Sequence, residues 1–98
     1  MPIGDMVTGQ ASVAGGGSSY LEVKPTGTEE WVIHNIYCPD GIALILRLWD
    51  GTLTTDWRSA PGPFNNLALH VNATRWLRIV NNDAAAQVLG YDGIKSHI

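Results

Sequence analysis

The sequence predicts an all-β protein: an antiparallel β-sandwich or jelly roll of about seven to eight strands, with an irregular N-terminal arm. Three observations support this fold class. Short runs of aromatic and β-branched residues alternate with polar ones. Turn residues recur roughly every ten positions, and a helical pattern is nearly absent. The chain has 98 residues, of which 45% are hydrophobic, enough for one domain with a packed core.

Residues 1–19 form a distinct segment that is rich in Gly, Ser and other small residues. We expect a flexible N-terminal arm here, which either frays or becomes ordered against a neighbouring subunit. The sandwich domain is then expected to span residues 20–98. Its first strand, 20–23, is short because Pro25 cannot donate a hydrogen bond to a central ladder.

The middle of the chain contains three expected strands. The run 31–38 is aromatic and β-branched, and Pro39-Asp40-Gly41 ends it as a turn. The next two strands, 43–49 and 53–58, flank Asp50-Gly51, which is the residue pair favoured in a type I′ hairpin turn. This arrangement predicts that the last two strands are hydrogen-bonded neighbours.

The C-terminal part begins with Ala60-Pro61-Gly62-Pro63, which we interpret as a loop without regular structure. A strand over 67–71 and a turn at Asn72-Ala73-Thr74 follow. Residues 75–94 read as a β-hairpin, because two alternating apolar runs flank the polar turn at Asn81-Asn82-Asp83.

Several expected strands carry large residues on both faces, although a half-buried strand normally has one polar face. The predicted core faces are Leu44, Leu46 and Leu48; Leu77 and Ile79; and Val32 and Ile36. The predicted second faces are Ala43, Ile45, Arg47 and Trp49; Trp76, Arg78 and Val80; and Trp31, Ile33 and Tyr37. Trp, Tyr and Arg are enriched at protein interfaces, and a monomer rarely leaves such a surface open.

The sequence therefore predicts a subunit or shell interface with these members: Trp31, Tyr37, Ile45, Arg47, Trp49, Trp76 and Arg78. The alternative is an incorrect assignment of faces, because a register error of one residue turns every side chain of a strand to the other side.

Composition narrows the function classes. The net charge is −3 and basic residues do not cluster, so we expect no nucleic-acid or membrane partner. The charged fraction is 15%, which suggests that the surface is largely uncharged or partly covered by another chain. The chain has one cysteine, Cys38, so it cannot form an internal disulfide. Residues 1–19 lack the charged and apolar regions of a secretory signal, so we expect the chain to start in the cytoplasm.

Motifs for catalysis or cofactor binding are not recognisable. His34 and His70 could face each other across neighbouring strands, but further ligands are not evident, so we expect no metal site. No nucleophile motif, carboxylate pair or phosphate loop stands out, and we expect neither an enzyme nor a cofactor. The four tryptophans allow an alternative, a carbohydrate-binding sandwich that stacks sugars on exposed rings.

Three runs carry a resemblance to a known group of proteins: residues 28–37 (TEEWVIHNIY), residues 67–72 (LALHVN), and residues 76–82 (WLRIVNN) with a later Gly90-Tyr91-Asp92-Gly93. Over roughly residues 19–95 the chain resembles small virion proteins of tailed bacteriophages. Some members of this group are capsid decoration (cement) proteins, and others are small components of tails and fibres. The matching motifs are strand and turn patterns without chemical groups.

The resemblance implies a β-sandwich or jelly-roll homotrimer on the outer surface of the capsid, where it would contact its own copies and the major capsid protein. No catalytic residue is implied. The expected function is therefore a structural one, a decoration protein that stabilises a phage head. The alternative is a receptor- or glycan-binding module, or a small structural component, of a phage tail or fibre.

Overall fold

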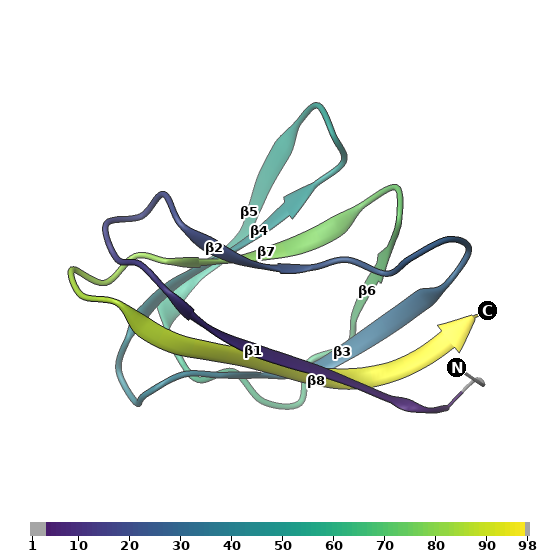
Figure 1. Ribbon diagram of the computed structural model, residues 1–98, viewed down its shortest axis with the longest axis horizontal. Coiled ribbons are helices and arrows are strands. Elements are labelled where there is room, and N and C mark those ends of the chain that lie inside the picture. Colours follow the sequence, from purple (N-terminus) through teal and green to yellow (C-terminus); the bar gives the residue numbers. More distant parts are fainter. Residues whose placement is uncertain (1–3, 98) are drawn as a thin grey trace.

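The computed structural model describes residues 4–97 of the chain. Within this range the chain forms eight strands and no helix, arranged as two four-stranded antiparallel sheets that pack against each other (Figure 1). The first sheet has the order β1 (Met6–Val13), β8 (Gln87–His97), β3 (Glu30–Tyr37), β6 (Leu69–Asn72). The second has the order β2 (Tyr20–Val23), β7 (Trp76–Asn81), β4 (Ala43–Trp49), β5 (Thr54–Pro61). The predicted all-β sandwich is confirmed.

The hairpin predicted around Asp50-Gly51 is present as β4 and β5, which project from the body of the molecule in Figure 1. The predicted type I′ turn is wrong, because Trp49 pairs with Thr54 across a four-residue connection and only Gly51, not Asp50, has a positive φ. The Asp50 carboxylate accepts hydrogen bonds from the backbone N–H groups of Thr52 (2.9 Å) and Leu53 (2.7 Å) and so closes the turn. The expected loop at residues 60–63 is wrong in part, since β5 continues to Pro61. An edge strand tolerates proline because one side of its backbone has no partner.

The N-terminal segment departs from the sequence prediction. Residues 6–13, which we assigned to the flexible arm, form β1 and pair with β8 at every position from Met6 to Val13. Val7 and Val13 are buried in the core. Spaced apolar residues among small polar ones were therefore sufficient for an edge strand, because β8 supplies the backbone partners. The domain consequently begins before Tyr20, and residues 1–3 of the predicted arm lie outside the described residues.

The predicted hairpin over residues 75–94 is wrong. Both strands exist, but β7 belongs to the second sheet and β8 to the first, so the turn between them crosses from one sheet to the other (Figure 1). The buried Asn81 holds this crossover. Its Nδ2 donates to the backbone oxygens of Val13 (2.9 Å) and Ala85 (3.0 Å), and its Oδ1 accepts from the Asp83 N–H (2.9 Å).

The core lies between the sheets and confirms most of the predicted core faces. Leu44, Leu46, Leu48, Leu77 and Ile79 are all buried. The third strand differs, because a register shift between Ile33 and Asn35 changes which residues point inward. Ile33 and Ile36 are both fully buried as a result, whereas the sequence placed them on opposite faces.

Candidate interaction surface

Five of the seven predicted interface residues come together on the outer face of the second sheet. They are Ile45, Arg47 and Trp49 of β4 and Trp76 and Arg78 of β7, and we call this set the aromatic–arginine face. In the register of the two strands, Trp49 lies opposite Trp76 and Arg47 lies opposite Arg78. The alternation of buried and partly exposed residues along β4 confirms that its three members point away from the core.

A row of charged residues crosses all four strands of this sheet. Strand pairing places Glu22 of β2 beside Arg78, Arg78 beside Arg47, and Arg47 beside Asp56 of β5. Arg47 Nε lies 2.6 Å from Asp56 Oδ1, and Arg78 Nη2 lies 3.9 Å from Glu22 Oε2. The hydrogen bond from Arg47 lowers the pKa of Asp56. Each central arginine is thus balanced by a carboxylate at its outer side, and the row is neutral overall.

Aromatic rings hold the cations of this face in place. The Arg78 guanidinium lies 4.3 Å from the centroid of the Tyr20 ring and 4.9 Å from that of Trp49. Lys24 Nζ lies 4.0 Å from the centroid of the Trp76 ring, which is 8% exposed. Such cation–π contacts are worth about 0.5–1 kcal/mol at exposed sites. They fix the positions of these side chains relative to one another.

Two donors of the face are buried without a hydrogen-bond partner in the described part of the chain, Trp76 Nε1 and Arg78 Nε. Buried polar groups are normally paired, so an orphan donor costs about 1–3 kcal/mol.

Sequence reasoning missed Tyr20, Glu22, Lys24 and Asp56 as members of this surface. Glu22 occupies an outward position of β2, whose alternation is visible in the sequence, whereas β5 is exposed from Thr54 to Ser59 and gives no such signal for Asp56. Their contact with the arginines depends on the strand order β2-β7-β4-β5, however, and the sequence does not contain that order.

The other two predicted interface residues lie elsewhere. Tyr37 is on the outer face of the first sheet, where its hydroxyl donates to Asp92 Oδ2 while Asn35 Nδ2 donates to Asp92 Oδ1. The hydrogen bond to Asp92 raises the pKa of Tyr37. Trp31 points inward, because its cross-strand partner is the buried Val71, and its ring stacks on Tyr91 at 6.5 Å between centroids.

A buried ion pair supports Trp31. Trp31 Nε1 donates to Glu29 Oε1 (3.1 Å), and Lys95 Nζ lies 3.2 Å from Glu29 Oε2. The Lys95 side chain is 1% exposed, which is unusual for a lysine. The hydrogen bond from Trp31, together with Lys95, lowers the pKa of Glu29. The carboxylate is thus occupied by structural contacts.

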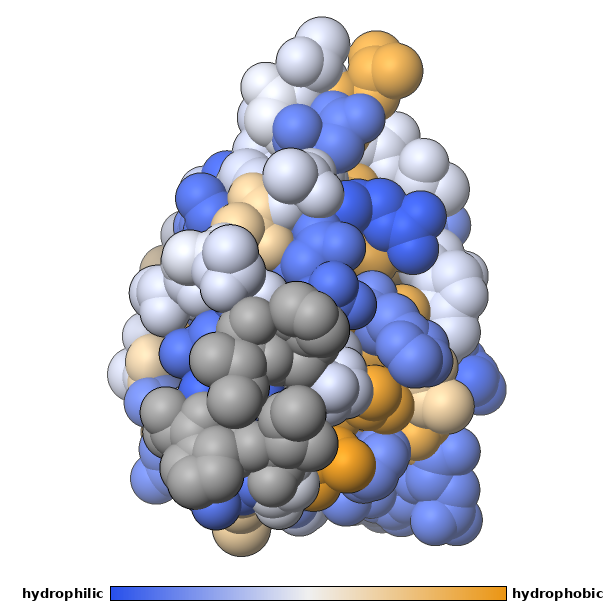
Figure 2. All heavy atoms as spheres, turned by 90° about the vertical axis from the view of Figure 1, so that its right-hand side faces the viewer, coloured by the Kyte–Doolittle hydropathy of each residue, from blue (hydrophilic) through white to orange (hydrophobic). Residues whose placement is uncertain are grey.

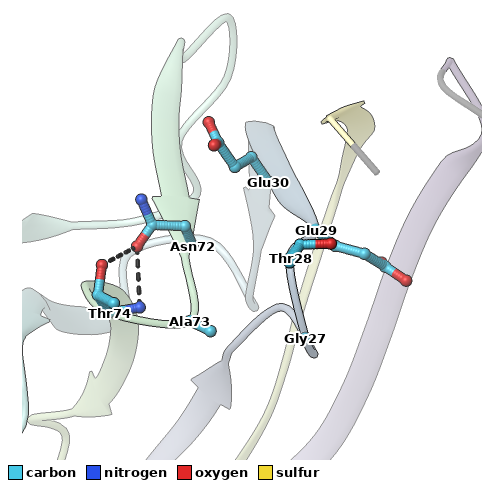
Figure 3. A pocket seen from close by; sticks show the side chains of 7 residues that line it. All are labelled: Gly27, Thr28, Glu29, Glu30, Asn72, Ala73 and Thr74. Atoms are coloured by element: carbon cyan, nitrogen blue, oxygen red, sulfur yellow. Dashed lines mark hydrogen bonds between the residues drawn. The ribbon is translucent and has the colours of Figure 1, made fainter.

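A cleft of about 340 Å³ lies between the turn before β3 and the turn after β6 (Figure 3). Asn72 Oδ1 accepts from Thr74 N (2.9 Å), Thr74 Oγ1 (2.7 Å) and Arg75 N (2.9 Å), which confirms the predicted turn. In Figure 3 the side chains of Glu29 and Glu30 point to opposite sides of their strand, so their carboxylates do not converge on one position in the cleft. The cleft therefore lacks a pair of groups suited to acid–base chemistry.

The face of the molecule near the two termini carries no comparable cluster of aromatic and arginine side chains among the described residues. Figure 2 faces the end of the molecule near the two termini and shows mostly hydrophilic residues with small, separate hydrophobic patches. Among residues 4–97, no three His, Cys, Asp or Glu side chains gather in a way that could hold a metal ion. The described chain has no helix long and apolar enough to cross a membrane.

No protein-family model matches the chain, and no curated protein is significantly similar to it. The likeness to small phage virion proteins therefore rests on the strand and turn motifs quoted above.

Proposed function

We propose that this protein is a structural component of a tailed phage, a homotrimeric capsid decoration protein on the outer surface of the head. It would act without a cofactor or a catalytic step. Its partners would be its own copies and the major capsid protein, rather than nucleic acid or a membrane. The resemblance described above supports this assignment.

The observation that carries the proposal is the aromatic–arginine face. The inner side of the second sheet forms the core. Its outer side carries a second set of large side chains, of which Trp76 and Val80 are buried and Ile45, Arg47, Trp49 and Arg78 are partly exposed. Trp, Tyr and Arg are the residue types that contribute most to the binding energy of protein interfaces. A preformed face also loses little side-chain entropy when a partner binds.

The stabilising effect on a shell would be mechanical. A standard interface buries about 800 Å² per partner, and apolar surface contributes about 25 cal/mol per Å². A trimer that bridges several shell subunits repeats this contribution at each contact. Because its attachment is multivalent, it would remain bound even where each single contact is weak.

The test is a matched pair of substitutions on the outer faces of the two sheets. Ile45→Lys adds a charge next to Arg47 at one end of the aromatic–arginine face, and Val88→Lys adds the same charge to the exposed face of β8. We expect Ile45→Lys to dissociate the trimer in sedimentation and to abolish binding to undecorated capsids. Val88→Lys should retain both properties. A wild-type protein that sediments as a monomer at micromolar concentration would refute the trimer.

The second candidate is a glycan- or receptor-binding module of a tail or fibre. It is favoured by the partly exposed rings of Tyr20 and Trp49, which lie on the same face as Glu22 and Asp56. Sugar-binding sites commonly combine aromatic rings, on which the sugar stacks, with carboxylates, which accept hydrogen bonds from its hydroxyl groups. A glycan array, followed by quenching of tryptophan fluorescence, would detect this activity. Copy number in the virion separates the two roles, with hundreds of copies on a head and a handful at a tail.

A further inference from the structure

Two long edge strands of the sandwich differ in how they are protected. β5 carries Asp56, Arg58 and Pro61, and its pairing with β4 is interrupted by a register shift. Charges, prolines and bulges are the usual devices that prevent an edge strand from pairing with another chain. β1 has none of them, because its eight residues are uncharged, include no proline and pair with β8 in one unbroken register.

The hydrogen bonds near the start of β1 show which backbone groups are free. The Lys95 N–H donates to the Asp5 oxygen (2.9 Å), so the backbone of Asp5 faces β8. Backbone direction alternates along an antiparallel strand, so Val7, Gly9 and Ala11 also face β8. The N–H and C=O groups of the residues between them face the open edge, and these residues are Met6, Thr8, Gln10 and Ser12. All four are exposed.

We propose that β1 pairs with β1 of a second copy of this chain, antiparallel and about a two-fold axis at Gly9. This register places Thr8 of one copy opposite Gln10 of the other, and Met6 opposite Ser12. All four edge-facing residues of each copy then have partners, which gives about eight backbone hydrogen bonds. Two four-stranded sheets become one continuous sheet across the axis.

Charge and side-chain size make a second copy a suitable occupant. No charged residue lies between Met6 and Val13, so self-pairing brings no like charges together within the strand. Asp5 would lie opposite Val13 of the other copy rather than opposite the second Asp5. At the axis Gly9 meets Gly9, so neither copy places a Cβ of its own there, and the Tyr91 ring lies over this position on the inner face. On the outer face the Thr8 hydroxyl, which donates to the Tyr91 backbone oxygen (2.9 Å), can accept from the Gln10 amide of the other copy. An antiparallel strand pair of identical sequence is two-fold symmetric, as the commonest homo-oligomers are.

This contact is separate from the aromatic–arginine face, which belongs to the other sheet. The β1 edge goes beyond the proposed decoration function and does not depend on it. If both contacts form, the β1 edge links neighbouring trimers to each other. If the face does not assemble, the β1 edge produces a dimer.

Amide hydrogen exchange measured by NMR on the wild-type protein tests the proposal directly. The amides of Met6, Thr8, Gln10 and Ser12 should exchange at least about tenfold more slowly at high than at low protein concentration. The amides of Val7, Gly9 and Ala11 are already bonded to β8 and should change little. Exchange that is equally fast at all concentrations for the four edge-facing residues would overturn the proposal.

Sedimentation of two variants supplies the second test. Gln10→Pro removes an N–H from the open edge and leaves the bonds to β8 in place, whereas Gln10→Ala keeps the N–H. We expect Gln10→Pro to lower the particle mass, to that of a single trimer or, if the face does not assemble, to that of a monomer. Gln10→Ala should leave the mass unchanged, with circular dichroism confirming that both variants are folded. Equal masses for folded Gln10→Pro and the wild type would overturn the proposal, and an unfolded variant leaves the decision to hydrogen exchange. Ile45→Lys should keep the protection of the β1 edge, so failure of the trimer and failure of this pairing give different results.

Discussion

Replacing Asn81 with alanine should destabilise the protein strongly, although this residue lies far from the proposed interface. Asn81 is fully buried at the end of β7, where the chain leaves the second sheet for the first. Its side chain makes three hydrogen bonds, to Val13, Ala85 and Asp83, at 2.9–3.0 Å. Alanine removes all three and leaves the carbonyl oxygen of the buried Val13 with one partner fewer.

The size of the effect follows from these contacts. Each hydrogen bond contributes about 1 kcal/mol net, so three of them contribute about 3 kcal/mol. A domain of this size loses roughly 4–8 °C in melting temperature per kcal/mol, which predicts a fall of about 15 °C. Thermal unfolding, followed by circular dichroism, measures this fall in melting temperature. A loss this large is a substantial part of the roughly 5–15 kcal/mol by which proteins are usually stable.

The neighbouring Asn82 supplies the control, because it has the same side chain but is exposed. Asn82→Ala should change the stability by less than about 0.5 kcal/mol. Asn81→Asp keeps an acceptor for Asp83 but loses both donors and buries a carboxylate, so it should be at least as damaging as alanine. If Asn81→Ala and Asn82→Ala melt at the same temperature, the crossover is not held by Asn81 and the reasoning is wrong.

Two further predictions concern other turns and contacts. In Gly9→Ala the new Cβ would lie 2.9 Å from Tyr91 Cε1, so the buried ring must shift, and we expect a loss of about 1–3 kcal/mol in urea unfolding; an unchanged midpoint would mean that the ring has room to move. The backbone N–H groups of Leu53 and Thr52 hold the pKa of Asp50 below its ordinary value. The stability that this carboxylate contributes is therefore present above its ordinary pKa and is lost as the pH falls through its folded-state pKa. Asp50→Asn should melt below the wild type at pH 7 and approach it at pH 3, and a constant difference across this range would contradict the assignment.

Local patterns in the sequence predicted local structure well. Asp50-Gly51 indicated the β4–β5 hairpin, and the alternation along residues 43–49 identified both the buried leucines and the outward Ile45, Arg47 and Trp49. These predictions succeeded because turn geometry and the two-residue period of a strand depend on neighbouring residues alone.

Predictions that needed a distant partner failed. The alternating runs on either side of Asn81 suit a hairpin and a crossover between sheets equally well, since both need two strands and a polar turn. Residues 6–13 have the composition of a flexible segment, and they form a strand because β8 supplies hydrogen-bond partners for their backbone. The register shift between Ile33 and Asn35 lets both Ile33 and Ile36 point into the core, and no residue type in that strand predicts such a shift.

For this protein the sequence by itself determined the class of fold, most strand positions and the residues that could form an interface, because these follow from residue size, polarity and period. The tertiary structure decided which of those residues meet. Strand order joined Arg47 and Arg78 to Asp56 and Glu22, separated Tyr37 and Trp31 from them, and left the uncharged β1 at an open edge. Strand order depends on the packing free energy of the whole core, which cannot be evaluated from any single segment of the sequence.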